Sequence, residues 1–449
     1  MDEQRLLIIR RRILLVFVFA VSATCSDSGA EEQETVGNFK NPAAVKEVLT
    51  GKRLVANAAW WGFDEDDSTD ALQGAINSGA RNVIIPYMGS DWIVRPIRLV
   101  SNQEILFDPG VVITAKKGEF KLTSDNLFKA ENKSNVTLRG YGATLKMQKE
   151  DYIKPDYPQG QWRMIINLAG CTNIKVLGLT LKDSGGDGVY IGETKVYGDR
   201  PSQNIVIRDC IFDNNYRQGI SVESVENLRV DNCIFKNTSG TLPSAGIDIE
   251  PHNTKGKLTD IVISNCISAN NEGAGFAACL NALTAESNDI SILFYNCHAI
   301  GCKWGLVLTS YNETGPEGLV EFRNCTSEYT LSSGIWVDSK TDAFDIRFKS
   351  CKVKNCASKK VFPQEKYDFP IFFRVNKQPP TEKRGTIEVN DCYVYDEKPR
   401  AAINVSPRTK TNGDLNIKGL LYVRNRFAQR LSLGLDVENT GLKVTHLRP

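Results

Sequence analysis

The chain has 449 residues and a formal net charge of +2, with basic and acidic residues almost balanced. This balance, without a basic stripe, argues against a nucleic-acid partner. The length exceeds that of most single domains, but a solenoid escapes that limit because each repeat packs only on its neighbours.

The first residues are typical of an export signal. Arg10–Arg12 precede a nine-residue apolar run, Ile13–Val21, which is too short to span a bilayer as a helix. We therefore expect a signal peptide at residues 1–24 and a location that is secreted, periplasmic or on the cell surface, with no membrane span. Lipidation of Cys25 is the alternative. Residues 25–50 are expected to form a polar tether, and residues 51–449 a single domain.

One heptapeptide pattern recurs from Asn135 onwards, at intervals of 23 to 41 residues. Its second position is always aliphatic and its fourth always apolar, which is the alternation of a strand with one buried face. The nine strong copies start at Asn135, Asn173, Asn204, Asn227, Asp260, Ser291, Leu319, Asp345 and Thr386. Weaker copies start at Glu104 and Asp414. Recurrence at variable spacing predicts a coil whose insertions lie in loops.

Seven of the 12 cysteines close copies of this pattern: Cys210, Cys233, Cys266, Cys297, Cys325, Cys351 and Cys392. Stacked inward, they are expected to form a column of free thiols rather than disulfides. Four residues further on, Asn214, Asn237, Asn270 and Asn355 predict an asparagine ladder at a corner.

A second, glycine-headed strand follows in most repeats. It starts at Gly188, Gly219, Gly246, Gly275, Gly305 and Gly334. Ahead of the repeats, Asp67 or Ser68 can cap a short helix near residues 69–78, which would cover the open end of the sheet. The sequence therefore predicts an all-β, right-handed parallel β-helix of about ten rungs with a short N-terminal capping helix.

These features resemble the pectate-lyase-like superfamily of parallel β-helix proteins. The opening segment, residues 60–94 (WWGFDEDDSTDALQGAINSGARNVIIPYMGSDWIV), is similar to the superfamily's capped helix and first strand. The resemblance spans residues 53–430 and implies the fold, while the superfamily contains hydrolases, lyases, epimerases and phage tailspikes.

Candidate catalytic carboxylates face outward on the glycine-headed strands. In each strand the second and fourth residues after the glycine point out, which groups Glu223, Asp248 and Glu250 with Asp187. Crowded carboxylates have raised pKa values, as an acid/base pair requires. On one strand face Asp248 and Glu250 lie ~6.6 Å apart between Cα atoms, close to the inverting geometry; Glu223 and Glu250 lie ~4.8 Å apart, nearer to the retaining one.

Two local resemblances suggest roles for these residues. The segment SGGDGVYI (184–191) is similar to the Asn-Thr-Asp-Gly segment of polygalacturonases, which implies a catalytic Asp187, but Arg217-Gln218-Gly219 stands where that family has paired aspartates. Glu250-Pro251-His252 and residues 216–224 (YRQGISVES) resemble alginate epimerases. In that interpretation Arg217 neutralises a uronate carboxylate, and His252 or Tyr190 exchanges the C5 proton.

Other outward residues are candidate substrate contacts. Trp304 and Trp336 have rings that suit sugar stacking, and Asp338 lies beside Trp336. Simpler readings are that Trp304 fills a corner, that His252 is a solvated turn residue, and that Arg217 pairs with Glu223 or Asp187.

Three functions remain open from the sequence. The leading one is a glycosidase that cleaves a polysaccharide with Asp248, Glu250, Glu223 and Asp187, and His252 is retained in the catalytic set. The second is a uronate lyase or C5-epimerase. The third is a glycan-binding surface protein without activity. No metal site or cofactor is expected, except calcium in the lyase case, and helix capping explains the acidic run Asp64–Asp67. The polysaccharide, its linkage and the oligomeric state stay undetermined.

Overall fold

A computed structural model describes residues 39–194, 200–359, 369–376, 385–408, 415–425 and 440–447. The chain divides into Met1–Asn38 and Phe39–Pro449, and the first of these units lies outside the described residues. The predicted signal peptide and Cys25 therefore fall outside the description. Among the described residues no helix has the length and apolar character needed to cross a membrane.

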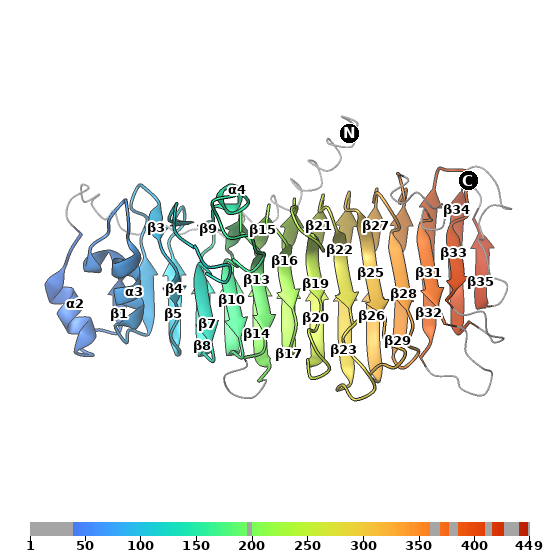
Figure 1. Cartoon of the computed structure of the whole chain (residues 1–449), viewed down its shortest axis with the longest axis horizontal. Helices are drawn as coiled ribbons and strands as arrows, with labels where there is room; N and C mark the ends of the chain where they lie inside the picture. Colours follow the sequence, from blue (N-terminus) through green and yellow to red (C-terminus); the bar gives the residue numbers. More distant parts are fainter. Residues whose placement is uncertain are drawn as a thin grey trace, which may run out of the picture. The chain divides into compact units, whose positions relative to one another are not determined.

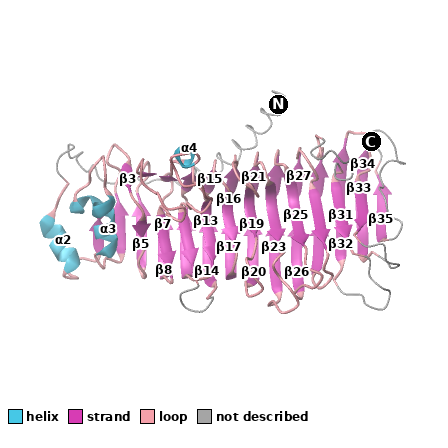
Figure 2. Cartoon of the chain, in the orientation of Figure 1, coloured by secondary structure: helices cyan, strands magenta, loops and turns pink. Residues whose placement is uncertain are grey.

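The described part of Phe39–Pro449 is a coil of parallel strands stacked rung on rung (Figure 1). Strands run along nearly the whole unit, and helices lie mainly near its N-terminal end (Figure 2). One sheet, here called sheet B, carries 11 strands, and a second sheet, sheet A, carries 24. Because each strand pairs with the equivalent strand one coil later, residues at matching positions form rows across each sheet.

Sheet B holds the glycine-headed strands and their neighbours. Its strands are β4 (Ile97–Arg98), β7 (Phe128–Glu131), β10 (Ile166–Ala169), β13 (Asp187–Gly192), β16 (Gln218–Val222), β19 (Ala245–Ile249), β22 (Ala274–Cys279), β25 (Trp304–Ser310), β28 (Ile335–Ser339), β31 (Ile371–Val375) and β33 (Ile403–Pro407). The six predicted strands are therefore present, in the middle of a longer series.

Sheet A contains a column of longer strands and a column of short ones. The longer strands are β1 (Val55–Asn57), β2 (Asn82–Ile85), β5 (Gln103–Phe107), β8 (Ser134–Arg139), β11 (Thr172–Leu177), β14 (Ser202–Arg208), β17 (Val225–Asp231), β20 (Leu258–Ser264), β23 (Ile290–Tyr295), β26 (Gly318–Arg323), β29 (Asp345–Lys349), β32 (Ile387–Asp396), β34 (Ile417–Asn425) and β35 (Gly441–His446). The short strands are β3 (Trp92–Val94), β6 (Val112–Ala115), β9 (Thr144–Lys146), β12 (Thr180–Lys182), β15 (Ile211–Asp213), β18 (Ile234–Lys236), β21 (Ile267–Ala269), β24 (His298–Ile300), β27 (Thr326–Glu328) and β30 (Lys352–Lys354).

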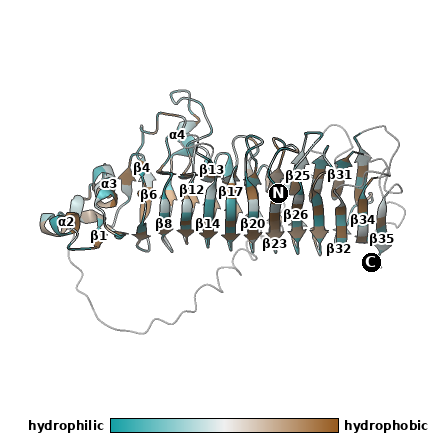
Figure 3. Ribbon diagram, turned by 90° about the horizontal axis from the view of Figure 1, so that it is seen from below, coloured by the Kyte–Doolittle hydropathy of each residue, from teal (hydrophilic) through white to brown (hydrophobic). Residues whose placement is uncertain are grey.

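The register of the nine strong copies is confirmed, because Val136 aligns with Ile174, Ile174 with Ile205, and so on to Ile387. The two weak copies are two residues out of register. Ile105 pairs with Leu138 and Ile417 pairs with Ile387. A two-residue slip keeps the same face buried, so alternation alone does not detect it. Hydropathy alternates along these strands in Figure 3.

The cysteine column is confirmed. The 11 cysteines of the described residues are all free, and the seven in equivalent positions are buried. Each thiol lies against carbonyl groups of its own and the preceding rung, as Cys266 does with Ser264 at 3.0 Å. These side chains act as small apolar fillers of the core.

The asparagine ladder lies at a different corner from the predicted one. It joins the first residues of the pattern: Asn135, Asn173, Asn204 and Asn227 each donate an amide bond of 2.8–3.0 Å to the asparagine one rung earlier. In the predicted column, Asn214 and Asn237 instead donate to Asp183 and Asp213. Both sets adopt positive φ angles, which asparagine tolerates better than most residues.

The N-terminal cap consists of α2 (Pro42–Leu49), η1 (Ala58–Trp61) and α3 (Thr69–Asn77), and a further helix, α4 (Lys149–Tyr152), lies in an insertion. Helix α3 buries Leu72 and Ile76 against the end of the core, which confirms the predicted capping helix. Helix α2 falls inside the predicted tether. Its Ala44 and Val48 are buried, and composition alone does not reveal this packing.

Candidate functional site

The outer face of sheet B brings the predicted acidic residues together. Tyr190 pairs with Ser221 and Ser221 with Asp248, so these three residues form one row on adjacent rungs. Glu223 and Glu250 directly follow their strands at equivalent positions, since their backbone N–H groups donate to Ile191 and Val222 at 2.8 Å. Strands β13, β16 and β19 therefore build one acidic centre.

The carboxylate of Asp187 forms an ion pair with an arginine. The Nε and Nη2 atoms of Arg217 donate to its two carboxylate oxygens at 2.8 and 2.7 Å, and both side chains are buried. Burial raises the pKa of Asp187, although Arg217 acts in the opposite direction. Burial lowers the pKa of Arg217, but the charge and hydrogen bonds of Asp187 outweigh it and leave that pKa raised. This bidentate pair fixes the start of β16 and keeps Asp187 from solvent.

Asp248 is a buried carboxyl without a full set of partners. Its Oδ2 accepts from Gln218 at 3.2 Å, and its Oδ1 is buried without a hydrogen-bond partner among the described residues. Burial and the charge of nearby Glu250 raise the pKa of Asp248 to about 7. A carboxyl in this setting retains its proton near neutrality.

Glu250 is the more accessible member of the pair. It comes directly after β19 and before Pro251, and its side chain is partly exposed. Burial raises the pKa of Glu250, while Arg217 and His252 oppose that rise. Two neighbouring carboxyls with raised pKa values can share one proton, which Glu250 can present to a ligand.

Glu223 receives hydrogen bonds from two sides. The Tyr190 hydroxyl donates to its Oε2, and His252 Nε2 lies 2.5 Å from its Oε1. The bond to Glu223 raises the pKa of His252, although partial burial opposes the rise. Burial and the charge of Glu223 raise the pKa of Tyr190. His252 is 60% exposed, so this group of residues reaches solvent at the loop after β19.

The expectation that all four acids are exposed is wrong. Asp187, Glu223 and Asp248 are at most 4% exposed, and Glu250 alone among them is partly open. Neighbouring side chains on the outer face cover them, including Arg217 and Gln218, which bind two of the acids directly.

The predicted aromatic residues lie further along the same face. Trp304 and Trp336 stack with ring centroids 5.2 Å apart, beside an outer apolar cluster that includes Ala277 and Val307. Val307 pairs with Trp336, and Ala277 with Asp248, so the row of Asp248 continues to Trp336. Trp304 therefore packs on the outer face and does not fill a corner of the core.

Asp338 is not presented to solvent. It is buried, and its carboxylate accepts from Nε of Arg374 at 2.9 Å and from Nε of Arg408 at 2.7 Å. The two arginines, rather than Asp338, form the polar surface there. Arg374 and Arg408 were not predicted, because strands β31 and β33 lack the leading glycine. The alternation IFFRV (371–375) was the available signal for Arg374.

Comparisons with known proteins agree with this architecture. Residues 159–259 match the family model described as "Right handed beta helix region". An uncharacterized Bacillus subtilis (strain 168) protein, YclG, is 25% identical over 223 residues. That match covers 44% of this chain and 38% of YclG, so this chain spans well under half of its curated relative.

Two solved structures resemble the chain over most of its length. The A-module of the Azotobacter vinelandii mannuronan C-5 epimerase AlgE6 has a TM-score of 0.61 and 14% identity, and the match covers 88% of this chain and 100% of the module. A Yersinia enterocolitica family 28 exopolygalacturonase has a TM-score of 0.55 and 13% identity, with 88% of this chain and 77% of that chain covered. At these identities the likeness concerns the fold. The chain thus has a right-handed parallel β-helix fold, as its repeat pattern predicted.

Proposed function

We propose that this protein is a secreted glycoside hydrolase that cleaves a polysaccharide along the outer face of sheet B. The observation that carries the proposal is the juxtaposition of Asp248, Glu250 and Glu223 on adjacent rungs, with Asp248 buried and one of its oxygens unpartnered among the described residues. Carboxylates at this spacing suit acid/base cleavage of a glycosidic bond. Two of the structural neighbours are named as enzymes that act on polysaccharides, an exopolygalacturonase and a mannuronan C-5 epimerase, which supports the same class of substrate.

In this proposal the Asp248–Glu250 pair supplies the general acid. The proton held by the pair reaches the leaving oxygen through Glu250, since Asp248 is buried. Glu223 is the second carboxylate: as the C–O bond breaks, it attacks the anomeric carbon to give an ester that water then hydrolyses, or it takes a proton from a water molecule that attacks this carbon directly. Tyr190 and His252 orient Glu223 by hydrogen bonds. Arg217 and Asp187 act as positioning residues at the start of the same strands.

The stereochemical outcome distinguishes two roles for Glu223. The ~4.8 Å between the Cα atoms of Glu223 and Glu250 favours direct attack by Glu223 on the anomeric carbon, which retains its configuration, whereas activation of a water molecule by Glu223 inverts it. Proton NMR of the first sugar anomer released from a substrate identifies the role in use.

A screen of purified protein on plant and marine polysaccharides tests the reaction class. New reducing ends without ultraviolet absorbance identify a hydrolase, and absorbance from a new double bond identifies a lyase. Binding without any product would leave a glycan-binding protein. Either of the last two results would overturn the hydrolase.

A C5-epimerase is the second candidate, favoured by one observation. Tyr190 and His252 converge on the two oxygens of Glu223, which places two proton-transfer groups side by side. Incorporation of solvent deuterium at C5 of an intact polyuronate, without new reducing ends, would support the epimerase instead.

A further inference from the structure

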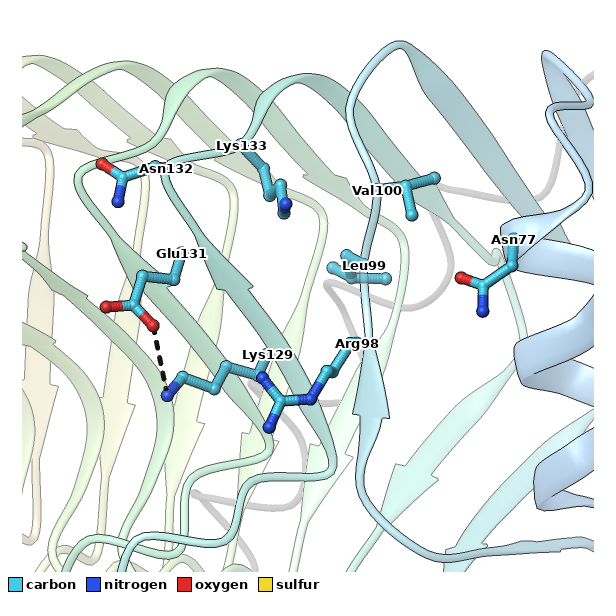
Figure 4. A pocket seen from close by; sticks show the side chains of 8 residues that line it. All are labelled: Asn77, Arg98, Leu99, Val100, Lys129, Glu131, Asn132 and Lys133. Atoms are coloured by element: carbon cyan, nitrogen blue, oxygen red, sulfur yellow. Dashed lines mark ion pairs between the residues drawn. The ribbon is translucent and has the colours of Figure 1, made fainter. Parts of the chain in front are cut away.

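A hollow of about 450 Å³ lies on the outer face of sheet B, on the N-terminal side of the acidic centre. It is lined by Asn77, Arg98, Leu99, Val100, Lys129, Glu131, Asn132 and Lys133. Figure 4 shows the Lys129 side chain between Arg98 and Glu131, with Lys133 across the hollow. None of these residues belongs to the acid/base centre described above.

The charge of this hollow is strongly positive. Three cationic side chains, Arg98, Lys129 and Lys133, line it together with one anionic side chain, Glu131. Lys129 Nζ lies 3.4 Å from Glu131 Oε2, so this pair is neutral overall. Arg98 and Lys133 make no ion pair with any described residue, and Arg98 is exposed. Two positive charges therefore face the hollow without a counter-charge from the described chain.

The hollow lies on the row that contains Asp248. Arg98 pairs with Lys129, Lys129 with Asn167 and Asn167 with Tyr190. From Tyr190 the row continues through Ser221 to Asp248. Lys129 and Asp248 are four rungs apart, or ~19 Å at ~4.8 Å per rung. An extended chain along this row would meet both places.

We infer that this hollow is a subsite for an acidic group, a carboxylate or a sulfate, on the sugar chain that the acidic centre cleaves. The inference rests on the proposed function for the identity of the ligand as a glycan. Arg98 and Lys133 supply the charge, and the amide nitrogen of Asn77 supplies a donor for a neighbouring oxygen. At the opposite end of the same face, Arg374 and Arg408 flank a single aspartate, so cationic side chains lie on both sides of the acidic centre.

The test compares matched charged and neutral glycans. Calorimetry on the full chain measures the Kd for oligogalacturonate against its methyl ester, and for a dextran sulfate oligosaccharide against dextran. The first pair probes a carboxylate and the second a sulfate. We expect one charged probe to bind at least about tenfold more tightly than its neutral match, and added salt to weaken that binding.

The variant Arg98→Gln/Lys133→Gln removes both charges and is expected to raise the Kd of the charged probe roughly tenfold. Compared with this double variant, the variant Arg98→Lys keeps a positive charge at position 98 and should recover part of the affinity. The control variant Lys175→Gln/Lys349→Gln makes the same charge change on strands of sheet A and should bind as wild type.

Three results would overturn the subsite: no binding of either charged probe, equal Kd values for charged and neutral probes, or an unchanged Kd in the double variant. Cleavage is measured separately on the same samples. Binding that depends on Arg98 and Lys133 without any cleavage would refute the hydrolase but not the subsite. Cleavage with no preference for charged glycans would refute the subsite but not the hydrolase.

Discussion

The Nε2 atom of His252 lies 2.5 Å from Oε1 of Glu223, which joins the loop after β19 to the end of the preceding rung. The contact ties an exposed imidazole to a buried carboxylate, and the Tyr190 hydroxyl binds the other oxygen of the same carboxylate. The two acidic rungs therefore act as one hydrogen-bonded unit. The pKa of His252 reports on the charge of this unit, and its NMR signals can be resolved because the chain has only three histidines.

Glu223→Gln should lower the pKa of His252. The hydrogen bond from the imidazolium to Glu223 is the largest cause of the raised His252 pKa, and a neutral amide no longer favours the charged form. A proton NMR titration of the imidazole signals measures the change. The resonances of His298 and His446 serve as internal controls, and an unchanged His252 titration would contradict the contact.

Glu250→Gln should reduce turnover by at least about 100-fold, because an amide cannot deliver a proton to the leaving oxygen. Circular dichroism should show an unchanged fold, since Glu250 is only partly buried. Glu317→Gln, at an exposed position before β26, is the matched control and should keep full activity. Equal activity of the two variants would refute the assignment of Glu250.

Asp248→Asn should stabilise the protein at pH 8 and not at pH 4. The pKa of Asp248 is about 7 in the folded chain against an ordinary 3.8, so the folded state binds more protons between these values. The free energy of unfolding of wild type therefore falls as pH rises through that window, whereas the amide variant has no such loss. Thermal unfolding at both pH values should show a Tm gain of at least about 2 °C at pH 8.

The same substitution should abolish cleavage, because the acid pair loses its shared proton. A variant that is more stable at pH 8 but inactive would indicate that the buried carboxylate of Asp248 lowers stability and is needed for cleavage. Wild-type kcat/KM is expected to fall as pH rises above about 7, where Asp248 ionises. Activity that rises steadily up to pH 9 would argue against this acid.

Asn204→Ala should destabilise the fold by about 1–3 kcal/mol. Asn204 donates to Asn173 at 3.0 Å and accepts from Asn227 at 2.8 Å, and its φ is 53°. Alanine loses both bonds and tolerates the left-handed conformation poorly. Asn204→Gly loses the same bonds without the backbone strain and should be less destabilised. Urea unfolding of both variants separates the two contributions.

Reducing agent should leave the Tm unchanged. The cysteine column consists of buried free thiols, and burial raises the pKa of Cys266, so the thiolate is scarce. Thermal unfolding with and without dithiothreitol measures this. A lower Tm under reducing conditions would show that disulfides exist in the protein.

The sequence by itself determined the coil. Side chains alternate strictly along a strand, so the sequence pattern shows which face is buried and which residues share a row. The pattern consists of the aliphatic second and apolar fourth positions of nine copies, the cysteine that closes seven of them, and the glycine-headed strands. The sequence alone therefore predicts that Tyr190, Glu223, Asp248 and Glu250 lie on neighbouring rungs of one face. The same alternation repeats every two residues, which is why the weak copies at Glu104 and Asp414 were placed two residues out of register.

Only the tertiary structure decided which of these groups are accessible and how they are paired. Arg217 binds Asp187 and not Glu223, and Asp338 accepts hydrogen bonds from arginines of two later rungs. Such contacts between rungs depend on side-chain direction and loop packing, which the alternation pattern does not give. The cationic hollow at Arg98 and Lys133 also arose from neighbouring rungs. Charges far apart in the sequence become one site only when the coil brings their strands into register.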